Sequence, residues 1–202
     1  AFLEDYYCTS EAWSVKKSAQ RVLVASNSWL YSQTQQGSGR YNKDKGYVCT
    51  LSAIIVKSTT AHIFHVGDSR IYRVHGGSLE QLTADHRHWI SDETSYLSRA
   101  LGVSEQLEID YQSLSVEQGD IFLLATDGVY EHTDSKVVFS AIKQHENDLD
   151  KAAQAIVEDA YEHGSTDNLT AQIVRIDELP SQNADEIYQQ ITELPFPPIL
   201  EA

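Results

Sequence analysis

The stretch FLLATDGVYEH, residues 122–132, joins an apolar run to an acidic residue. Residues 121–125 are continuously apolar, which is typical of a strand that is covered on both faces. Such a strand would normally be closed by a neutral turn, but here Asp127 follows it closely. Asp-Gly is also a common turn dipeptide, because Gly tolerates positive φ and Asp bonds its own backbone. The stretch therefore predicts a buried strand and leaves open whether Asp127 serves only the turn.

Two more Asp residues occupy comparable places next to predicted strands. Asp68 lies in VGDSR between two strands, and Asp167 lies in GSTDN just before the last strand. Each also has an ordinary explanation as a hairpin turn, a cap or an Asx turn. If these carboxylates meet at the strand ends, their charges repel, and a cation between them is the usual remedy. Oxygen ligands without Cys or clustered His favour Mg²⁺ or Mn²⁺ over Zn²⁺.

Around these motifs the apolar spacing alternates between helical and strand-like patterns. Residues 11–36 carry apolar positions at three- and four-residue steps, which predicts a long amphipathic helix capped by Ser10. Residues 48–83 predict four successive antiparallel strands, VCTLSAIIV, AHIFHV, RIYRVH and LEQLT. The remaining predicted elements are a helix-like segment at 91–102, strands at 107–114 and 120–125, two helices within 135–163, and a closing strand at 168–176. Strand runs interrupted by paired helices indicate an α+β layered fold.

Length and composition favour one soluble domain followed by a tail. The chain has 202 residues and a mass of 22.7 kDa, which fits one domain because splitting usually begins beyond ~250 residues. We expect the domain to span residues 1–176. The acidic segment 177–202 is expected to be a tail or linker, with a short helix at 187–194 before its prolines.

The formal net charge of -15 disfavours binding to nucleic acid or to an anionic membrane, because both are polyanions. No run of residues is apolar over the length of a membrane span. Cys8 and Cys49 are too few for a disulfide framework, so free thiols and a cytoplasmic location are expected.

Several motifs, taken together and in this order, resemble the type 2C (PPM) family of metal-dependent protein serine/threonine phosphatases, in its bacterial form. The matching motifs are VGDSRIYR at 66–73, LTADH at 82–86, SRALG at 98–102, GDIFLLATDGVYE at 119–131 and GSTDNLTAQIV at 164–174. The resemblance implies a four-layer α-β-β-α sandwich with two antiparallel sheets.

The resemblance also implies a metal centre and its ligands. Asp127 and Asp167 would bind one of two catalytic Mn²⁺ or Mg²⁺ ions, and Asp68 would bind a third, weaker ion. A water activated by the metals would attack the phosphorus of phosphoserine or phosphothreonine in a protein substrate, so no protein nucleophile is needed.

Four other polar residues are expected to have structural roles. Asn168 is expected to orient its turn, and Arg99 to position backbone or a carboxylate. His62 and His65 alternate with apolar residues on a predicted strand, and a Zn²⁺ role for them lacks further ligands at suitable spacing.

The resemblance does not extend to the family's upstream part. There the family has an Asp-Gly motif whose Asp bridges both metals, a substrate-phosphate Arg and a proposed acid His, and none of these precedes the helix predicted at 11–36. We therefore expect a chain truncated at its N-terminus, without the first strands of the sandwich, and weakly active or inactive by itself. The ending ITELPFPPILEA is similar to the junction at which bacterial proteins join such a phosphatase to a protein kinase, so a fused or cognate kinase is a further expected partner.

Two other functions stay open at this point. A noncatalytic domain of the same fold could bind phosphoproteins or regulate a linked kinase, and the missing upstream ligands favour this function for the chain itself. The presence of Asp68, Asp127 and Asp167 favours an enzyme. An acidic interaction module with incidental turns would require three motif matches by chance.

Overall fold

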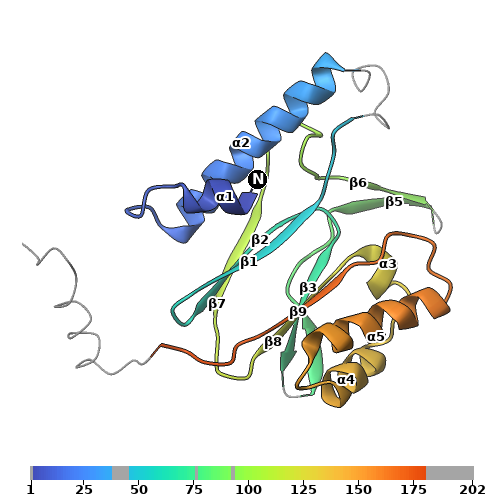
Figure 1. Cartoon of the computed structure of the whole chain (residues 1–202). Helices are drawn as coiled ribbons and strands as arrows, with labels where there is room; N and C mark the ends of the chain where they lie inside the picture. The colour runs from blue at the N-terminus through green and yellow to red at the C-terminus, as the bar shows by residue number, and fades with distance from the viewer. Residues whose placement is uncertain (1, 38–45, 76, 92–93, 181–202) are drawn as a thin grey trace, which may run out of the picture.

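The computed structural model describes residues 2–37, 46–75, 77–91 and 94–180, which form an α+β fold with antiparallel sheets (Figure 1). In chain order the elements are α1 (Phe2–Tyr7), α2 (Val15–Gln36), β1 (Leu51–Lys57), β2 (Thr60–Val66), β3 (Arg70–His75), β4 (Ser78–Gln81), β5 (Arg87–Ser91), β6 (Thr94–Leu97), β7 (Asp110–Ser115), β8 (Ile121–Ala125), α3 (Asp127–Tyr130), α4 (Ser135–Gln144), α5 (Leu149–Glu162) and β9 (Ala171–Arg175). The α+β class with antiparallel sheets that was expected from the sequence is confirmed.

The strands form a three-stranded sheet of order β1-β2-β7, a four-stranded sheet of order β4-β3-β8-β9, and the hairpin β5-β6. The four strands predicted over residues 48–83 exist, but their expected pairing in succession is wrong between β2 and β3. These two strands belong to different sheets, and Gly67 lies at the crossing with a φ of 117°. A side chain is excluded at Gly67 because its Cβ would lie 2.4 Å from the side chain of Thr50.

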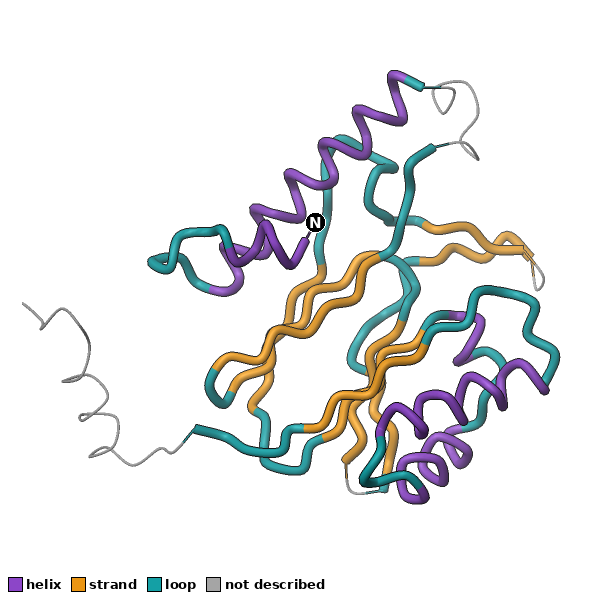
Figure 2. Tube along the Cα trace, viewed as in Figure 1, coloured by secondary structure: helices purple, strands orange, loops and turns teal. Residues whose placement is uncertain are grey.

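Helices cover the outer face of each of the two larger sheets (Figures 1 and 2). Val15, Ala19 and Leu23 of α2 pack on Phe64 of β2, in a cluster that also takes in side chains of β1 and β7. On the other side, α4 and α5 pack on the four-stranded sheet, where Ile156 meets Leu123 of β8.

A third apolar cluster joins β2 to β8. It contains Ala61, Val116, Phe122 and Ile176, all buried. Phe122 in this cluster and Leu123 in the cluster under α4 and α5 are neighbours in β8, so successive side chains point to opposite faces of the strand. The prediction that this strand is covered on both faces is confirmed, and burial of its side chains stabilises both interfaces at about 25 cal/mol per Å² of apolar surface.

Two predicted elements differ from the structure. The long helix begins at Val15 instead of residue 11, because Ser14 provides the cap: its Oγ accepts a hydrogen bond from the backbone N–H of Lys17. The prediction of a helix-like segment at 91–102 is wrong. Its first part pairs within the β5-β6 hairpin, and Leu101 exchanges two backbone hydrogen bonds with Cys49, so the apolar spacing there serves strand and bridge contacts.

The other expectations agree with the structure where it can be compared. The two predicted helices are α4 and α5, the closing strand is β9, and Cys8 and Cys49 are both free and exposed. The helix predicted at 187–194 and the prolines that follow it lie outside the described residues. In the described part of the chain, every helix is too short or too polar to cross a membrane.

Candidate metal centre

The three candidate Asp residues lie at one end of the four-stranded sheet. Arg70 of β3 pairs with Ala125 of β8, and Ala125 in turn pairs with Ala171 of β9. These three paired residues therefore lie side by side at the same end of the antiparallel strands. Asp68 comes just before β3, Asp127 just after β8, and Asp167 shortly before β9. Chain segments that are far apart in sequence therefore bring the three residues to the same end of the sheet.

Asp127 is fixed by the way its loop packs on the loop that carries Asp167. The Asp127 Oδ1 atom accepts a hydrogen bond of 3.0 Å from the Gly128 N–H, and the Thr126 hydroxyl donates to the Asn168 carbonyl at 3.1 Å. A Cβ at Gly128 would lie 2.8 Å from the Asn168 carbonyl oxygen and 3.2 Å from the Asp167 Cβ. Glycine is therefore needed at position 128 for the close approach of the two loops, and not for the positive φ that Asp-Gly turns often use.

Asp167 is exposed and held locally. Its Oδ1 atom accepts a hydrogen bond of 2.7 Å from the Asn168 N–H. The Asn168 backbone thus bonds both to Asp167 and to Thr126, and the role of its side chain in orienting the turn stays a prediction.

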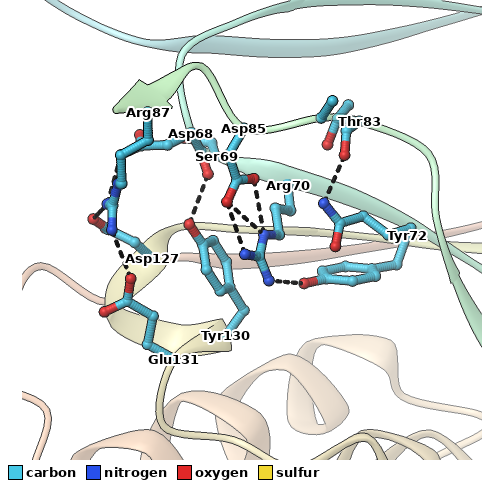
Figure 3. Close-up of polar contacts among 12 residues, drawn as sticks. Asp68, Ser69, Arg70, Tyr72, Thr83, Asp85, Arg87, Asp127, Tyr130 and Glu131 are labelled. Carbon is cyan, nitrogen blue, oxygen red and sulfur yellow. Dashed lines mark hydrogen bonds and ion pairs between the residues drawn. The ribbon is translucent and has the colours of Figure 1, made fainter. Parts of the chain in front are cut away.

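Arg87 joins Asp68 to Asp127 (Figure 3). Its Nη2 atom lies 2.6 Å from the Asp68 Oδ2 atom and also 2.6 Å from the Asp127 Oδ2 atom, and its Nη1 atom lies 2.7 Å from the Glu131 Oε1 atom. Burial by itself would lower the pKa of Arg87, but the hydrogen bond and the charge of Asp68, with the hydrogen bond of Glu131, raise the pKa above its usual value. The guanidinium therefore stays charged among these carboxylates.

The backbone of Asp68 is held by a tyrosine on α3. The Tyr130 hydroxyl donates a hydrogen bond of 2.9 Å to the Asp68 carbonyl, and Arg70 lies over the Tyr130 ring at 3.7 Å (Figure 3). Arg70 in turn forms a bidentate ion pair with Asp85. Burial, followed by the charge of Asp85, raises the pKa of Tyr130, so the hydroxyl remains a donor to Asp68.

The donor chemistry of Asp68 and Asp127 fits a hard cation, because one positively charged nitrogen already lies between their two carboxylate oxygens. Asp167 lies close to this neighbourhood, since a Cβ at Gly128, next to Asp127, would be 3.2 Å from the Asp167 Cβ. Among the described residues, however, no three His, Cys, Asp or Glu side chains converge closely enough to hold a metal ion. The metal-binding roles of Asp68, Asp127 and Asp167 stay predictions.

The sequence reasoning missed Arg87 and Glu131. Glu131 lies one turn after Asp127, close enough that a helix starting at Asp127 would have suggested it. Arg87 follows the LTADH motif directly. Nothing in the local sequence indicates that its side chain bonds to Asp68, 19 positions before it, and to Asp127, 40 positions after it.

A buried network of histidines supports the strand that leads to Asp68. The His86 Nδ1 atom accepts a hydrogen bond from the Gly67 N–H at 3.0 Å, so its Nε2–H donates to Asp110 at 2.9 Å. Asp110 also accepts a hydrogen bond of 2.8 Å from Arg99. Arg99 thus positions a carboxylate, as predicted.

The two histidines of β2 have hydrogen-bond partners within the protein. The ring of His65 lies between Ser52 and the Ala84 carbonyl, at 2.9 and 3.0 Å, and His62 contacts the Tyr111 hydroxyl at 3.0 Å. These contacts agree with the structural roles expected for both.

Comparison with known proteins identifies the family. A model of the protein phosphatase 2C family matches residues 2–176. The chain is 30% identical over 196 residues to the serine/threonine phosphatase Stp of Listeria monocytogenes, covering 83% of this chain and 75% of that protein. It is 28% identical over 189 residues to Stp of Listeria welshimeri, covering 82% and 73%.

Solved structures share the fold. PppA, described as a key regulatory component of the type VI secretion system (T6SS) in Pseudomonas aeruginosa, is similar with a TM-score of 0.72 and 25% identity, over 86% of this chain and 76% of that chain. The catalytic domain of PstP, a serine/threonine phosphatase whose structure contains two manganese ions, gives a TM-score of 0.72 at 22% identity, over 87% of this chain and 77% of that chain. The structure of the Mycobacterium tuberculosis serine/threonine phosphatase PstP/Ppp also gives a TM-score of 0.72 at 22% identity, over 87% of this chain and 78% of that chain.

The chain therefore belongs to the protein phosphatase 2C family. By homology it is classed with the protein serine/threonine phosphatases.

Proposed function

We propose that this chain hydrolyses phosphoserine and phosphothreonine in proteins, with Mn²⁺ or Mg²⁺ held by Asp68, Asp127 and Asp167. The family match and the two manganese ions in PstP support the proposal. The observation that carries it is the placement of all three Asp residues at one end of the four-stranded sheet, with two of them around the positive charge of Arg87.

In this proposal the protein's own residues fix the carboxylates before any metal arrives. The Gly128 and Asn168 backbone N–H groups orient Asp127 and Asp167, and Tyr130 holds the backbone at Asp68. When bound, the divalent ions supply positive charge that activates water and neutralises the phosphoryl oxygens. The carboxylates of Asp68 and Asp127 are already held around one positive charge, which lowers the cost of bringing these two like charges together in such a centre.

We propose that the layers follow the four-layer α-β-β-α order of the family. The cluster under α2, the cluster joining β2 to β8, and the cluster under α4 and α5 support this order. Further strands upstream of Ala1, with an Asp that bridges two metals, stay a prediction. If they are part of the complete protein, a longer chain should be more active than the 202-residue chain.

A second candidate is a noncatalytic domain that binds phosphoproteins or regulates a linked kinase. One observation favours it: Arg87 already pairs with both Asp68 and Asp127 without a metal. A cytoplasmic location and a fused or cognate kinase likewise stay predictions.

Hydrolysis of a phosphothreonine peptide by the 202-residue chain tests the proposal. We expect slow phosphate release in Mn²⁺ that stops with EDTA, and a loss of at least about tenfold on Asp127→Asn, since a metal ligand is removed. Asp150→Asn, an exposed change in the first turn of α5, should leave the rate unchanged. Phosphopeptide binding without any Mn²⁺-dependent release, in both this chain and a longer one, would favour the noncatalytic candidate instead.

A further inference from the structure

We propose that Arg87 is an internal cation that occupies the Asp68 and Asp127 carboxylates in the metal-free protein and competes with the divalent ion for them. The inference rests on the proposed metal-dependent function. It adds a residue that controls how readily the metal centre forms.

The geometry makes the two cations mutually exclusive. A single atom, Arg87 Nη2, lies 2.6 Å from one oxygen of each carboxylate. A metal ion bound to the same two oxygens would lie about 2.0–2.6 Å from each, which is the space that this nitrogen fills. Two positive charges could not share that space, so the metal can bind these oxygens only after the guanidinium has left.

The charge balance explains why Arg87 sits there and why a divalent ion could displace it. Asp68, Asp127 and Glu131 bring three carboxylates around one guanidinium, so an excess of negative charge remains. The side chains of Arg87 and Asp68 are each only 12% exposed, and their attraction is therefore only partly screened by solvent. An ion with two charges on one atom neutralises this cluster better than a guanidinium with one delocalised charge.

The backbone next to Arg87 is fixed, so release requires a change of its side chain. The His86 N–H donates to the Gly67 carbonyl at 2.7 Å, and the Ser98 N–H donates to the His86 carbonyl at 2.8 Å. Beyond this anchor, β5 pairs with β6 and with no other described strand. Rotation about the bonds of the Arg87 side chain would carry the guanidinium away without moving either larger sheet.

Mn²⁺ binding, measured by the loss of the free-ion electron paramagnetic resonance signal, tests the competition. If Arg87 occupies the carboxylates in most molecules, Arg87→Gln should bind Mn²⁺ about tenfold more tightly than the unmodified chain, because the binding-competent fraction rises. Arg175→Gln is the matched control, since it also removes one partly exposed guanidinium paired with an Asp, but at the opposite end of β9, where Arg175 pairs with Ile121. Its Mn²⁺ affinity should be unchanged.

A second measurement uses the unmodified protein and does not depend on any variant folding. The Arg87 Nε–H donates to the Asp68 Oδ2 atom at 3.0 Å, and its ¹⁵N resonance should move to the position of a solvent-exposed arginine on saturation with Mg²⁺. The Arg70 Nε–H, which donates to Asp85 at 2.9 Å, is the internal control and should not move.

The outcomes separate this inference from the proposed function. Equal Mn²⁺ affinity in the unmodified chain and in Arg87→Gln, an equal gain in Arg175→Gln, or an Arg87 resonance that does not move when Mg²⁺ binds would overturn the competition and leave the metal centre intact. Absence of Mn²⁺ and Mg²⁺ binding in every protein would overturn both the inference and the metal-dependent function.

Discussion

At the scale of single residues, the glycine of the Asp127-Gly128 pair has a role other than the one that the dipeptide suggests. Asp-Gly suggests a turn with left-handed glycine, but Asp127 begins α3 and Gly128 is not among the positive-φ glycines of the described residues. What the glycine provides is room for the Asn168 carbonyl, and hence the approach of the loops that carry Asp127 and Asp167.

This leads to a prediction for Gly128→Ala. The new methyl group would lie 2.8 Å from the Asn168 oxygen, so one loop must shift, and we expect the free energy of unfolding to fall by about 1–3 kcal/mol. Metal-dependent phosphate release should fall as well, because Asp127 and Asp167 move apart. Denaturant titration and the peptide assay measure the two effects, with Gly37→Ala at the C-cap of α2 as the control. Unchanged stability would show that the two loops are less tightly packed than the structure indicates.

At the scale of elements, the start of α2 depends on which serine caps it. Ser10 and Ser14 are both followed by helix-compatible residues, and apolar spacing alone does not choose between them. In the structure Ser14 adopts the extended cap conformation and accepts from Lys17, whereas residues 11–13 form a turn. The first turn of α2 then places Val15 and Ala19 on the three-stranded sheet.

We therefore expect Ser14→Ala to cost about 1 kcal/mol of stability, which is typical of the loss of a cap. Ser10→Ala should cost only a small fraction of this, because Ser10 lies outside the helix and, among the described residues, its side chain accepts one long hydrogen bond, of 3.4 Å from the Ala12 N–H. Thermal unfolding of the two variants side by side measures the difference. A larger loss for Ser10→Ala would place the functional cap at the earlier serine.

At the scale of the whole molecule, buried polar groups tie separate strands and loops together. The rings of His65, in β2, and His86, just before β5, lie 4.7 Å apart between centres and are tilted by 47° to each other, and through Asp110 His86 connects β7 to the loop that contains Gly67. Burial lowers the pKa of His65. Partial burial would raise the pKa of Asp110, but hydrogen bonds from His86 and Arg99 more than offset this and lower it.

These shifts predict that the protein loses stability as the pH falls. For His65 the unfolded chain takes up a proton first, near its ordinary pKa of about 6.5, so stability decreases as the pH falls below that value. For Asp110, whose pKa is lowered in the folded state, stability is present above the unfolded pKa of about 3.9 and is lost as the pH falls through the folded value.

Chemical denaturation across pH 4 to 8, that is about the range in which histidine titrates, measures the first effect. His65→Gln should flatten the curve near neutral pH, whereas His163→Gln, on an exposed histidine at the end of α5, should leave its shape unchanged. A pH dependence that survives in His65→Gln would assign the effect to other groups.

The sequence by itself determined the strongly periodic elements and the local motifs. The continuous apolar run 121–125 requires burial on both faces, and Ala152, Ile156 and Ala160 require one buried helix face, because removing apolar side chains from water dominates the free energy of folding. The three Asp motifs could be placed at strand ends for the same reason: each follows or precedes a run that must be buried.

Only the tertiary structure decided which segments meet. Pairing of β2 with β7 and of β3 with β8 joins residues far apart in the chain, and short-range periodicity does not contain that choice. For the same reason the position of Arg87 between Asp68 and Asp127 was not predictable. A guanidinium finds its carboxylates through charge and distance in space, and those distances exist only after the sheets have formed.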